Sequence, residues 1–124
     1  MADNGTKLIA IVDDDDSVRS ALQGLFKSVG INAQAFASAE EFINADQQLH
    51  TSCLITDIRM PGMSGLDLQA RLNAENFRIP IIFITAHGDA KMRLRALRAG
   101  AVEFLAKPFN DEALLESVRV ALEI

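Results

Sequence analysis

The sequence predicts a single α/β domain built on a parallel β-sheet. Short apolar runs alternate five times with amphipathic stretches of helical period, which is the pattern of repeated strand–helix units. The 124 residues also match the size of one compact domain with one main core region. We therefore expect five strands and five helices, with no internal domain boundary.

The five apolar runs have the length and composition of strands. They comprise residues 8–12, 32–36, 53–56, 81–84 and 102–105. The run at 81–84 is apolar throughout, as a strand covered by helices on both faces must be. The runs at 32–36 and 102–105 alternate more clearly, so we expect them at the edges of the sheet. This gives the strand order 2-1-3-4-5, which is that of doubly wound, flavodoxin-like folds.

The stretches after the strands have helical period and recognisable end signals. The expected helices are residues 17–29, a short helix from residue 38, residues 64–72, a helix that ends at residue 100 and a last helix after residue 110. Gly30 ends the first helix, Ser38 and Glu41 have the spacing of a capping box, and Asn110 is a good N-cap. The apolar face of the first helix comprises Val18, Ala21, Leu22, Leu25 and Val29, and that of the last Leu115, Val118 and Leu122.

Composition and charge narrow the classes of function. Hydrophobic residues make up 49% and charged residues 23% of the chain, which is ordinary globular usage. No apolar run approaches the roughly 18 residues of a membrane span, and the polar start does not resemble a signal peptide, so we expect a cytoplasmic protein with no membrane contact. The net charge of -5 argues against direct nucleic acid binding by this segment. Cys53 lies in an apolar run and is expected to be a buried, inert thiol.

Acidic residues gather where two neighbouring strands should end. Asp13 and Asp14 follow the first strand and Asp57 follows the third, and adjacent parallel strands lie about 4.8 Å apart, so their carboxylates should share one crevice. A hard cation relieves their repulsion, and Mg²⁺ suits a site with few carboxylates, waters and phosphate oxygens. Thr85 and Lys107 close the fourth and fifth strands and can hold phosphate oxygens. The sequence thus outlines a phosphoryl-transfer site.

Each of these residues has an ordinary structural explanation when taken alone. Acids after strands often cap helices, and a surface Lys is usually solvated. The convergence of five such groups on one rim of the expected sheet favours the functional interpretation. Asp15 and Asp16 are instead expected to face water at a helix start, where negative charge is favoured, and the lone loop residue His87 is left out of the catalytic set.

The motifs at these strand ends resemble those of the receiver domains of two-component response regulators. The motifs are IVDD at 11–14, TDIRMPGMSG at 56–65, ITA at 84–86 and KPF at 107–109, and the resemblance covers about residues 7–123. It implies that Asp57 accepts a phosphoryl group, which Thr85 and Lys107 bind. It also implies that Asp14, Asp57 and the backbone carbonyl of Arg59 ligate Mg²⁺ directly, while Asp13 helps through water.

The segments TAHGD at 85–89 and AGAVEF at 99–104 are similar to the FixJ branch of this family. Members of that branch usually carry a C-terminal DNA-binding helix-turn-helix domain. We therefore expect residues 1–124 to be a receiver domain cut from a longer regulator, with transcription as its output. The resemblance further implies a sensor histidine kinase as partner, and a phosphoacceptor that assists its own phosphorylation and dephosphorylation rather than an enzyme.

We expect Thr85 and Phe104 to act together as a conformational switch. A phosphoryl oxygen would draw the Thr85 hydroxyl toward Asp57, and Phe104 would fill the vacated space, which remodels the face made by the fourth helix, the fifth strand and the fifth helix. The alternative is that Phe104 is an ordinary core residue. The same face carries the cations Lys91, Arg93, Arg95 and Arg98. These could pair with acids of a second copy, so a homodimer through this face is a further expectation.

Two rival functions fit parts of the pattern. The segment DDDDSV at 13–18 approximates the nucleophile motif of haloacid-dehalogenase-like phosphatases, with Asp13 as nucleophile. That family needs an acidic pair after a later strand, where this chain has Thr85, Ala86 and His87, and the chain is short for the fold. A flavin-binding module is disfavoured because the chain has no Trp or Tyr to stack on a flavin and no Ser/Thr-rich phosphate loop after the first strand. Mapping the phosphorylated aspartate separates the first rival from a receiver.

Overall fold

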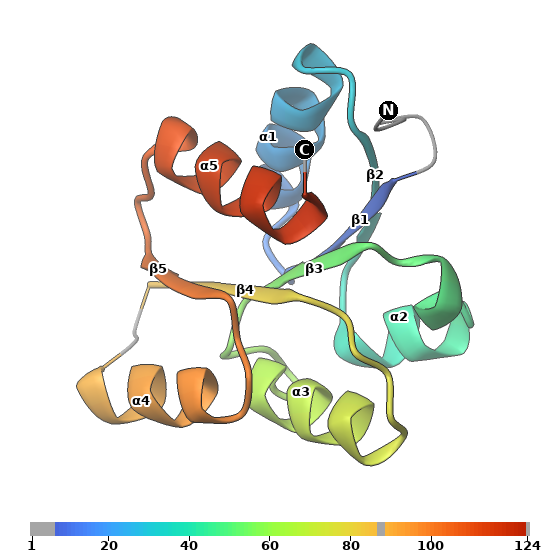
Figure 1. Cartoon of the computed structure of the whole chain (residues 1–124), viewed down its shortest axis with the longest axis vertical. Coiled ribbons are helices and arrows are strands. Elements are labelled where there is room, and N and C mark those ends of the chain that lie inside the picture. Colours follow the sequence, from blue (N-terminus) through green and yellow to red (C-terminus); the bar gives the residue numbers. More distant parts are fainter. Residues whose placement is uncertain (1–6, 87–88, 124) are drawn as a thin grey trace.

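A sheet of five parallel strands forms the middle layer of the molecule, with helices on both of its faces (Figure 1). The computed structural model describes residues 7–86 and 89–123. The strands are β1 (Leu8–Val12), β2 (Asn32–Phe36), β3 (Cys53–Thr56), β4 (Ile81–Thr85) and β5 (Glu103–Ala106). Their order is β2-β1-β3-β4-β5 and every pair is parallel, which confirms the predicted topology with the second and fifth strands at the edges.

Among the described residues, five α-helices and one short 3₁₀ helix connect or follow the strands. They are α1 (Asp16–Ser28), α2 (Ala39–Asn44), η2 (Gln48–His50), α3 (Gly65–Ala74), α4 (Ala90–Arg98) and α5 (Asp111–Leu122). Helices α1 and α5 cover one face of the sheet, and α2, α3 and α4 cover the other (Figure 1). The sequence did not predict η2. Helix α3 continues two residues beyond the expected 64–72 and is followed by Asn76 in the left-handed conformation, with φ of 62°.

Alternate residues of the strands point into two separate apolar cores. Under α1 and α5 the fully buried strand residues are Ile9, Ile11, Cys53, Ile55, Ile82 and Ile84. Under α2, α3 and α4 the sheet contributes Ala10, Val12, Phe36, Leu54, Ile81 and Phe83. Because both faces of β1, β3 and β4 are covered, these strands are the most firmly held part of the sheet, and their carboxyl ends form a fixed platform.

Two of the predicted helix faces need correction. In α1, Phe26 is fully buried, whereas Val29 is 38% exposed because the helix ends at Ser28 and Val29 lies in its C-cap. In α5, Leu114 is fully buried and Leu115 only partly. The error in α5 is a shift of one position around the helix axis, whereas in α1 the helix ends before Val29, and Ala21 is exposed rather than buried.

Side-chain caps fix where the helices begin. The Asp15 carboxylate accepts the backbone N–H of Ser17 and Val18, and the Ser38 hydroxyl accepts that of Glu41. A reciprocal capping box occurs at Ser64 and Asp67, at the start of α3. These caps place the helix starts directly after the carboxyl-end loops, so the loops around the acids are held from both sides.

Candidate functional site

Three carboxylates meet at the carboxyl ends of β1 and β3. Val12 and Thr56, the last residues of the two strands, are partners in the sheet, and Asp13 and Asp57 follow them directly. The Asp57 N–H donates to the Val12 carbonyl at 3.0 Å, and the Asp13 N–H donates to the Phe36 carbonyl at 3.2 Å. Carboxylate oxygens of Asp13, Asp14 and Asp57 all lie within 4.8 Å of one another. The structure therefore brings these three predicted residues together.

Lys107 joins the acids across the sheet. Its Nζ lies 2.9 Å from Oδ2 of Asp13 and 2.9 Å from Oδ2 of Asp57. The Lys107 N–H donates to the Thr85 carbonyl at 2.9 Å, so the chain beyond β5 is tied to the end of β4 and the side chain reaches back over the intervening strands. One cation thus bridges two carboxylates that come from β1 and β3.

Backbone donors orient the carboxylates. Oδ1 of Asp57 accepts the N–H of Ile58 at 2.6 Å, and Oδ1 of Asp13 accepts the N–H of Asp15 at 2.9 Å. Asp57 and Asp13 are buried, whereas Asp14 is exposed. Within residues 7–86 and 89–123, no hydrogen bond to the Asp14 side chain is found. Asp14 is therefore the acid of the cluster that is most open to an incoming cation.

Burial and charge act against each other in this site. Burial raises the pKa of the Asp13 carboxyl, although hydrogen bonds from Asp15 and Lys107 act in the opposite direction. Burial by itself would lower the pKa of Lys107, but its hydrogen bonds and ion pairs with Asp57 and Asp13 outweigh burial and raise that pKa. Lys107 is therefore held in its charged form. One cation facing three acids leaves an excess of negative charge, which favours a divalent metal ion.

Thr85 and Phe104 lie on the same face of the sheet. Phe83 and Phe104 are partners between β4 and β5, and their ring centroids lie 6.3 Å apart. Thr85 is two residues after Phe83 and therefore points to the same face, where it is buried beside Ala106 in the register. Phe104 is only partly buried. Thr85 and Phe104, the two residues of the predicted switch, thus lie on the same face of β4 and β5, toward the core under α2, α3 and α4.

The loop between β3 and α3, which carries Arg59, is closed at its base by a bond from the Gly65 N–H to the Ile58 carbonyl at 2.9 Å. A Cβ at Gly65 would overlap the Asp57 carbonyl, so this close approach requires glycine. From the sequence, Gly65 is expected only to form a loop, and no role is expected for Glu40, whose carboxylate accepts the Met63 N–H in this loop. The glycine directly after the N-cap Ser64 could have indicated the close approach at residue 65. No neighbouring residue in the sequence indicates the contact made by Glu40.

The remaining candidates lie outside the cluster or outside the described residues. Asp15 and Asp16 are exposed at the start of α1, where Asp16 pairs with Arg19 at 2.7 Å, as expected for helix-start acids. Cys53 is fully buried, and burial raises its pKa to about 12, which agrees with an inert thiol. His87 lies outside the described residues.

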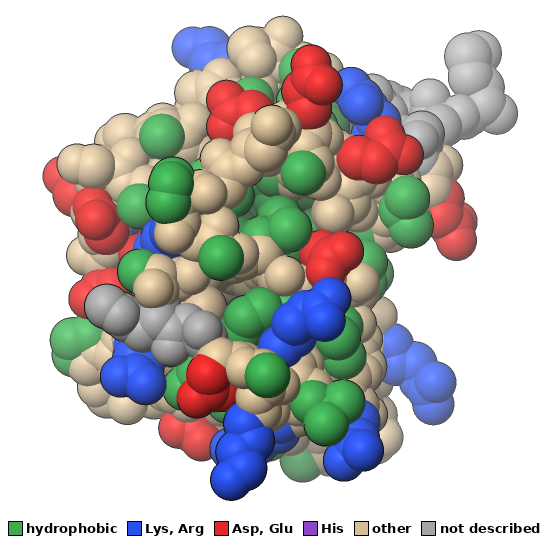
Figure 2. All heavy atoms as spheres, turned by 90° about the vertical axis from the view of Figure 1, so that its left-hand side faces the viewer, with side chains coloured by type: hydrophobic (Ala, Val, Ile, Leu, Met, Phe, Trp, Pro, Cys, Tyr) green, Lys and Arg blue, Asp and Glu red, His purple; other side chains and the backbone are tan. Residues whose placement is uncertain are grey.

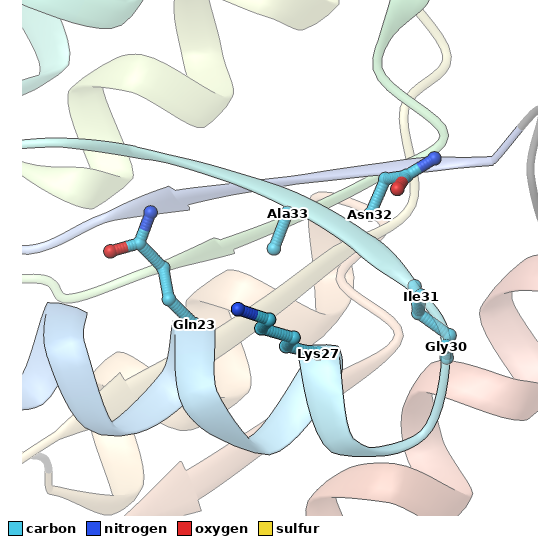
Figure 3. Close-up of a pocket in the computed structure, with 6 residues that line it drawn as sticks. All are labelled: Gln23, Lys27, Gly30, Ile31, Asn32 and Ala33. Atoms are coloured by element: carbon cyan, nitrogen blue, oxygen red, sulfur yellow. The ribbon is translucent and has the colours of Figure 1, made fainter.

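A cavity between α1 and β2 is separate from this site (Figure 3). Gln23 and Lys27 line it from α1, and Asn32 and Ala33 line it from β2. These two β2 residues begin the strand, so the cavity lies at the amino edge of the sheet, opposite the edge that carries Asp57.

Among the described residues, no helix is long and apolar enough to span a bilayer.

The fold and this site define a response regulator receiver domain, and the chain belongs to that family. The family model matches residues 9–119. Receiver domains are signalling modules of two-component systems that accept a phosphoryl group, bind Mg²⁺ at an acidic pocket and interact with sensor histidine kinases. This membership does not favour the phosphatase alternative.

Individual relatives place the chain in the FixJ-like branch. It is 50% identical to Nodulation protein W of Bradyrhizobium diazoefficiens, over 94% of this chain and 51% of that protein. It is 41% identical to Transcriptional regulatory protein FixJ of Azorhizobium caulinodans, over 92% of this chain and 54% of that protein. The chain thus spans about half the length of the curated relatives it matches.

Solved structures agree with the fold. The response regulator StyR is 46% identical, with a TM-score of 0.89 over 95% of this chain and 60% of that chain. The structure of FixJ-N is 38% identical, with a TM-score of 0.85 over 99% of this chain and 96% of that chain.

Proposed function

We propose that Asp57 is the phosphoacceptor of a Mg²⁺-dependent receiver that a sensor histidine kinase phosphorylates. The observation that carries this assignment is the bridging position of Lys107, 2.9 Å from both Asp13 and Asp57 in a cluster of three acids. A lysine in that position can hold an oxygen of a phosphoryl group on Asp57 and offset the charge that would repel an anionic donor. The Asp57 N–H donates to the Val12 carbonyl, and the Asp57 carboxylate accepts the Ile58 N–H. Both the backbone and the side chain of the proposed nucleophile are therefore held in place.

The residues present fit a Mg²⁺ ion. Oxygens bound to one Mg²⁺ at about 2.1 Å lie within roughly 4.2 Å of one another, close to the spacing within this cluster. We assign direct ligation to Asp14, Asp57 and the backbone carbonyl of Arg59, and ligation through water to Asp13. When bound, the ion would neutralise carboxylate and phosphoryl charge.

The proposed reaction is transfer of a phosphoryl group to Asp57. A carboxylate oxygen of Asp57 forms a bond to phosphorus while the bond from phosphorus to the donor imidazole nitrogen, or to the acetate oxygen of acetyl phosphate, breaks with its electron pair. Lys107 and the Thr85 hydroxyl then hold phosphoryl oxygens of the acyl phosphate. The same site would assist attack of water on that phosphorus, so the domain would promote its own dephosphorylation.

The proposed output follows from Thr85 and Phe104. Movement of Thr85 toward the new phosphoryl group would open space on the face it shares with Phe104, which packs only partly into the core. The affected surface comprises α4, β5 and α5. Figure 2 shows Lys and Arg side chains gathered on the lower part of this side of the molecule, where α4 exposes Lys91, Arg93, Arg95 and Arg98. We propose that acids of a second copy pair with this surface in a homodimer.

The regulatory setting is proposed from the relatives. Because the curated relatives are about twice as long as this chain, we propose that the receiver acts within a longer cytoplasmic regulator and controls transcription through another domain. The acidic receiver itself, with a net charge of -5, would then take no direct part in nucleic acid binding.

Phosphorylation by acetyl phosphate and Mg²⁺, followed by intact-mass and peptide mapping, tests the assignment of Asp57. The parent protein should gain one phosphoryl group on the peptide that carries Asp57, and Asp57→Asn should gain none. Undiminished labelling of Asp57→Asn, mapped to Asp13, would overturn the assignment in favour of phosphatase-like chemistry.

Asp14→Asn should weaken Mg²⁺ binding and slow labelling without unfolding the protein. Unchanged Mg²⁺ affinity of that variant in a titration would exclude Asp14 as a direct ligand.

A further inference from the structure

An acid outside the carboxylate cluster ties the loop between β3 and α3 to α2. Oε2 of Glu40 accepts the backbone N–H of Met63 at 2.9 Å, and the two residues are 23 positions apart in the chain. This hydrogen bond is the main reason why the pKa of the exposed Glu40 carboxyl is lowered. Glu40 thus accepts a hydrogen bond from a distant loop. This contact is part of neither a helix cap nor the hydrogen bonding of the sheet.

Gly62 gives independent evidence that the loop is shaped around Glu40. Its φ is 78°, a conformation that favours glycine. A Cβ added at this position would overlap the Glu40 carboxylate. A side chain at residue 62 would therefore have to displace the Glu40 carboxylate from the loop, so glycine leaves room for the contact.

The other anchors of the loop hold its base and one side. Residues 58 and 65 are joined at the base, and Met60 is buried and Met63 partly buried in the α2/α3/α4 core. Within the part of the chain that the structure describes, Glu40 is the one side chain from another element that accepts or donates a hydrogen bond to residues 59–63. The α2 backbone that carries Glu40 is held in place, because Ala39 and Phe42 in the same helix are fully buried.

We propose that Glu40 is a positioning residue for the metal site: by holding Met63, it fixes the tip at residues 59–63 and so keeps the Arg59 carbonyl ready for Mg²⁺. This rests on the metal site proposed above. The physical reason is preorganisation. A backbone carbonyl that must first be ordered contributes less to binding than one already in place, and losing a partner that orients a ligand typically costs 10–100-fold in metal affinity.

Three variants separate the hydrogen bond from the charge. Glu40→Ala removes both, Glu40→Gln removes the charge but keeps an oxygen that can accept the Met63 N–H, and Glu41→Ala removes the same charge from the neighbouring exposed position. Amide NMR on the whole domain would give the Mg²⁺ dissociation constant by titration and the exchange rate of the Met63 amide without metal. The thermal midpoint, followed by circular dichroism, would check that each variant is folded.

The proposal predicts that Glu40→Ala weakens Mg²⁺ binding by about tenfold, the lower end of the range for such partners, and speeds exchange of the Met63 amide. Glu40→Gln and Glu41→Ala should stay within about twofold of the parent dissociation constant. Equal weakening by Glu40→Ala and Glu41→Ala would show a charge effect and overturn the proposal. Faster Met63 exchange with unchanged Mg²⁺ affinity would also overturn it. Failure of the parent protein to bind Mg²⁺ would instead remove the metal site itself, and with it this inference, so the two failures are distinguishable.

Discussion

Helices α3 and α4 lie on the same face of the sheet but are held very differently (Figure 1). The residues that α3 buries are Gly65, Leu66, Leu68, Gln69 and Leu72. Helix α4 buries only Ala96, and its Leu94 is 49% exposed. Helix α3 is part of the core beneath the loop that follows Asp57, while α4 is largely exposed. Elements with few buried contacts open at low free-energy cost, so α4 is the better suited of the two to respond to a signal.

Within the described residues, the side-chain hydrogen bonds from α3 to α4 lie at the C-terminal end of α4, while Met92 near its N-terminal end packs against the core that α3 shares. The Gln69 side-chain amide donates to the Ala96 carbonyl at 3.0 Å, and that of Asn73 donates to the Ala99 carbonyl at 3.0 Å. These carbonyls belong to the last turn and C-cap of α4, where the ordinary helical partners run out, and the Ala96 carbonyl also accepts the Ala101 N–H at 3.0 Å. The N-terminal end of α4, at Ala90, instead begins five residues after Thr85, the residue expected to move.

The largest expected effect is on stability, from truncating one leucine in each helix. Leu72→Ala removes a fully buried side chain from α3 and should lower the free energy of unfolding by about 2–5 kcal/mol. Leu94→Ala removes a half-exposed side chain from α4 and should cost no more than about 0.5 kcal/mol. Urea unfolding followed by circular dichroism measures both. A similar loss in the two variants would contradict the contrast between the helices.

A smaller effect is expected from releasing the C-terminal end of α4. Gln69→Leu keeps the buried volume of the side chain but removes one of the two donors to the Ala96 carbonyl, which still accepts the Ala101 N–H, at a cost of about 1 kcal/mol. Amide exchange should accelerate across α4 more than across α3. Gln23→Leu, the same replacement at an exposed position on α1, is the matched control and should change neither. Uniform acceleration across both helices would show that Gln69 supports the core rather than tethering α4.

The sequence was sufficient for the sheet and for the residues at its carboxyl edge. Strands such as 81–84 are marked by continuous apolar residues, and in a parallel sheet the end of each strand fixes where Asp13, Asp57 and Lys107 must lie. These features depend on local periodicity and topology, which a single sequence contains.

The contacts that the sequence could not predict are polar and join distant positions. Glu40 with Met63 and Gln69 with Ala96 are pairs of a side chain and a backbone group, so the identity of one partner leaves no trace in the sequence. The sequence pattern also could not decide which apolar residues of α1 are buried. Phe26 and Val29 are both apolar, and Val29 is exposed because α1 ends at Ser28. Periodicity locates a helix face to within about one residue in such cases.

A phosphoryl group on the firmly held half of the molecule is expected to change the loosely held α4/β5 half. Amide NMR spectra with Mg²⁺, with and without a beryllofluoride mimic of the phosphoryl group, test it most directly, with Asp57→Asn as the control that cannot take up the mimic. We expect shifts at Thr85 and Phe104 that extend through residues 90–106, and none of them in Asp57→Asn. Shifts confined to the loops of Asp13, Asp57 and Lys107, with residues 90–106 unchanged, would contradict the claim.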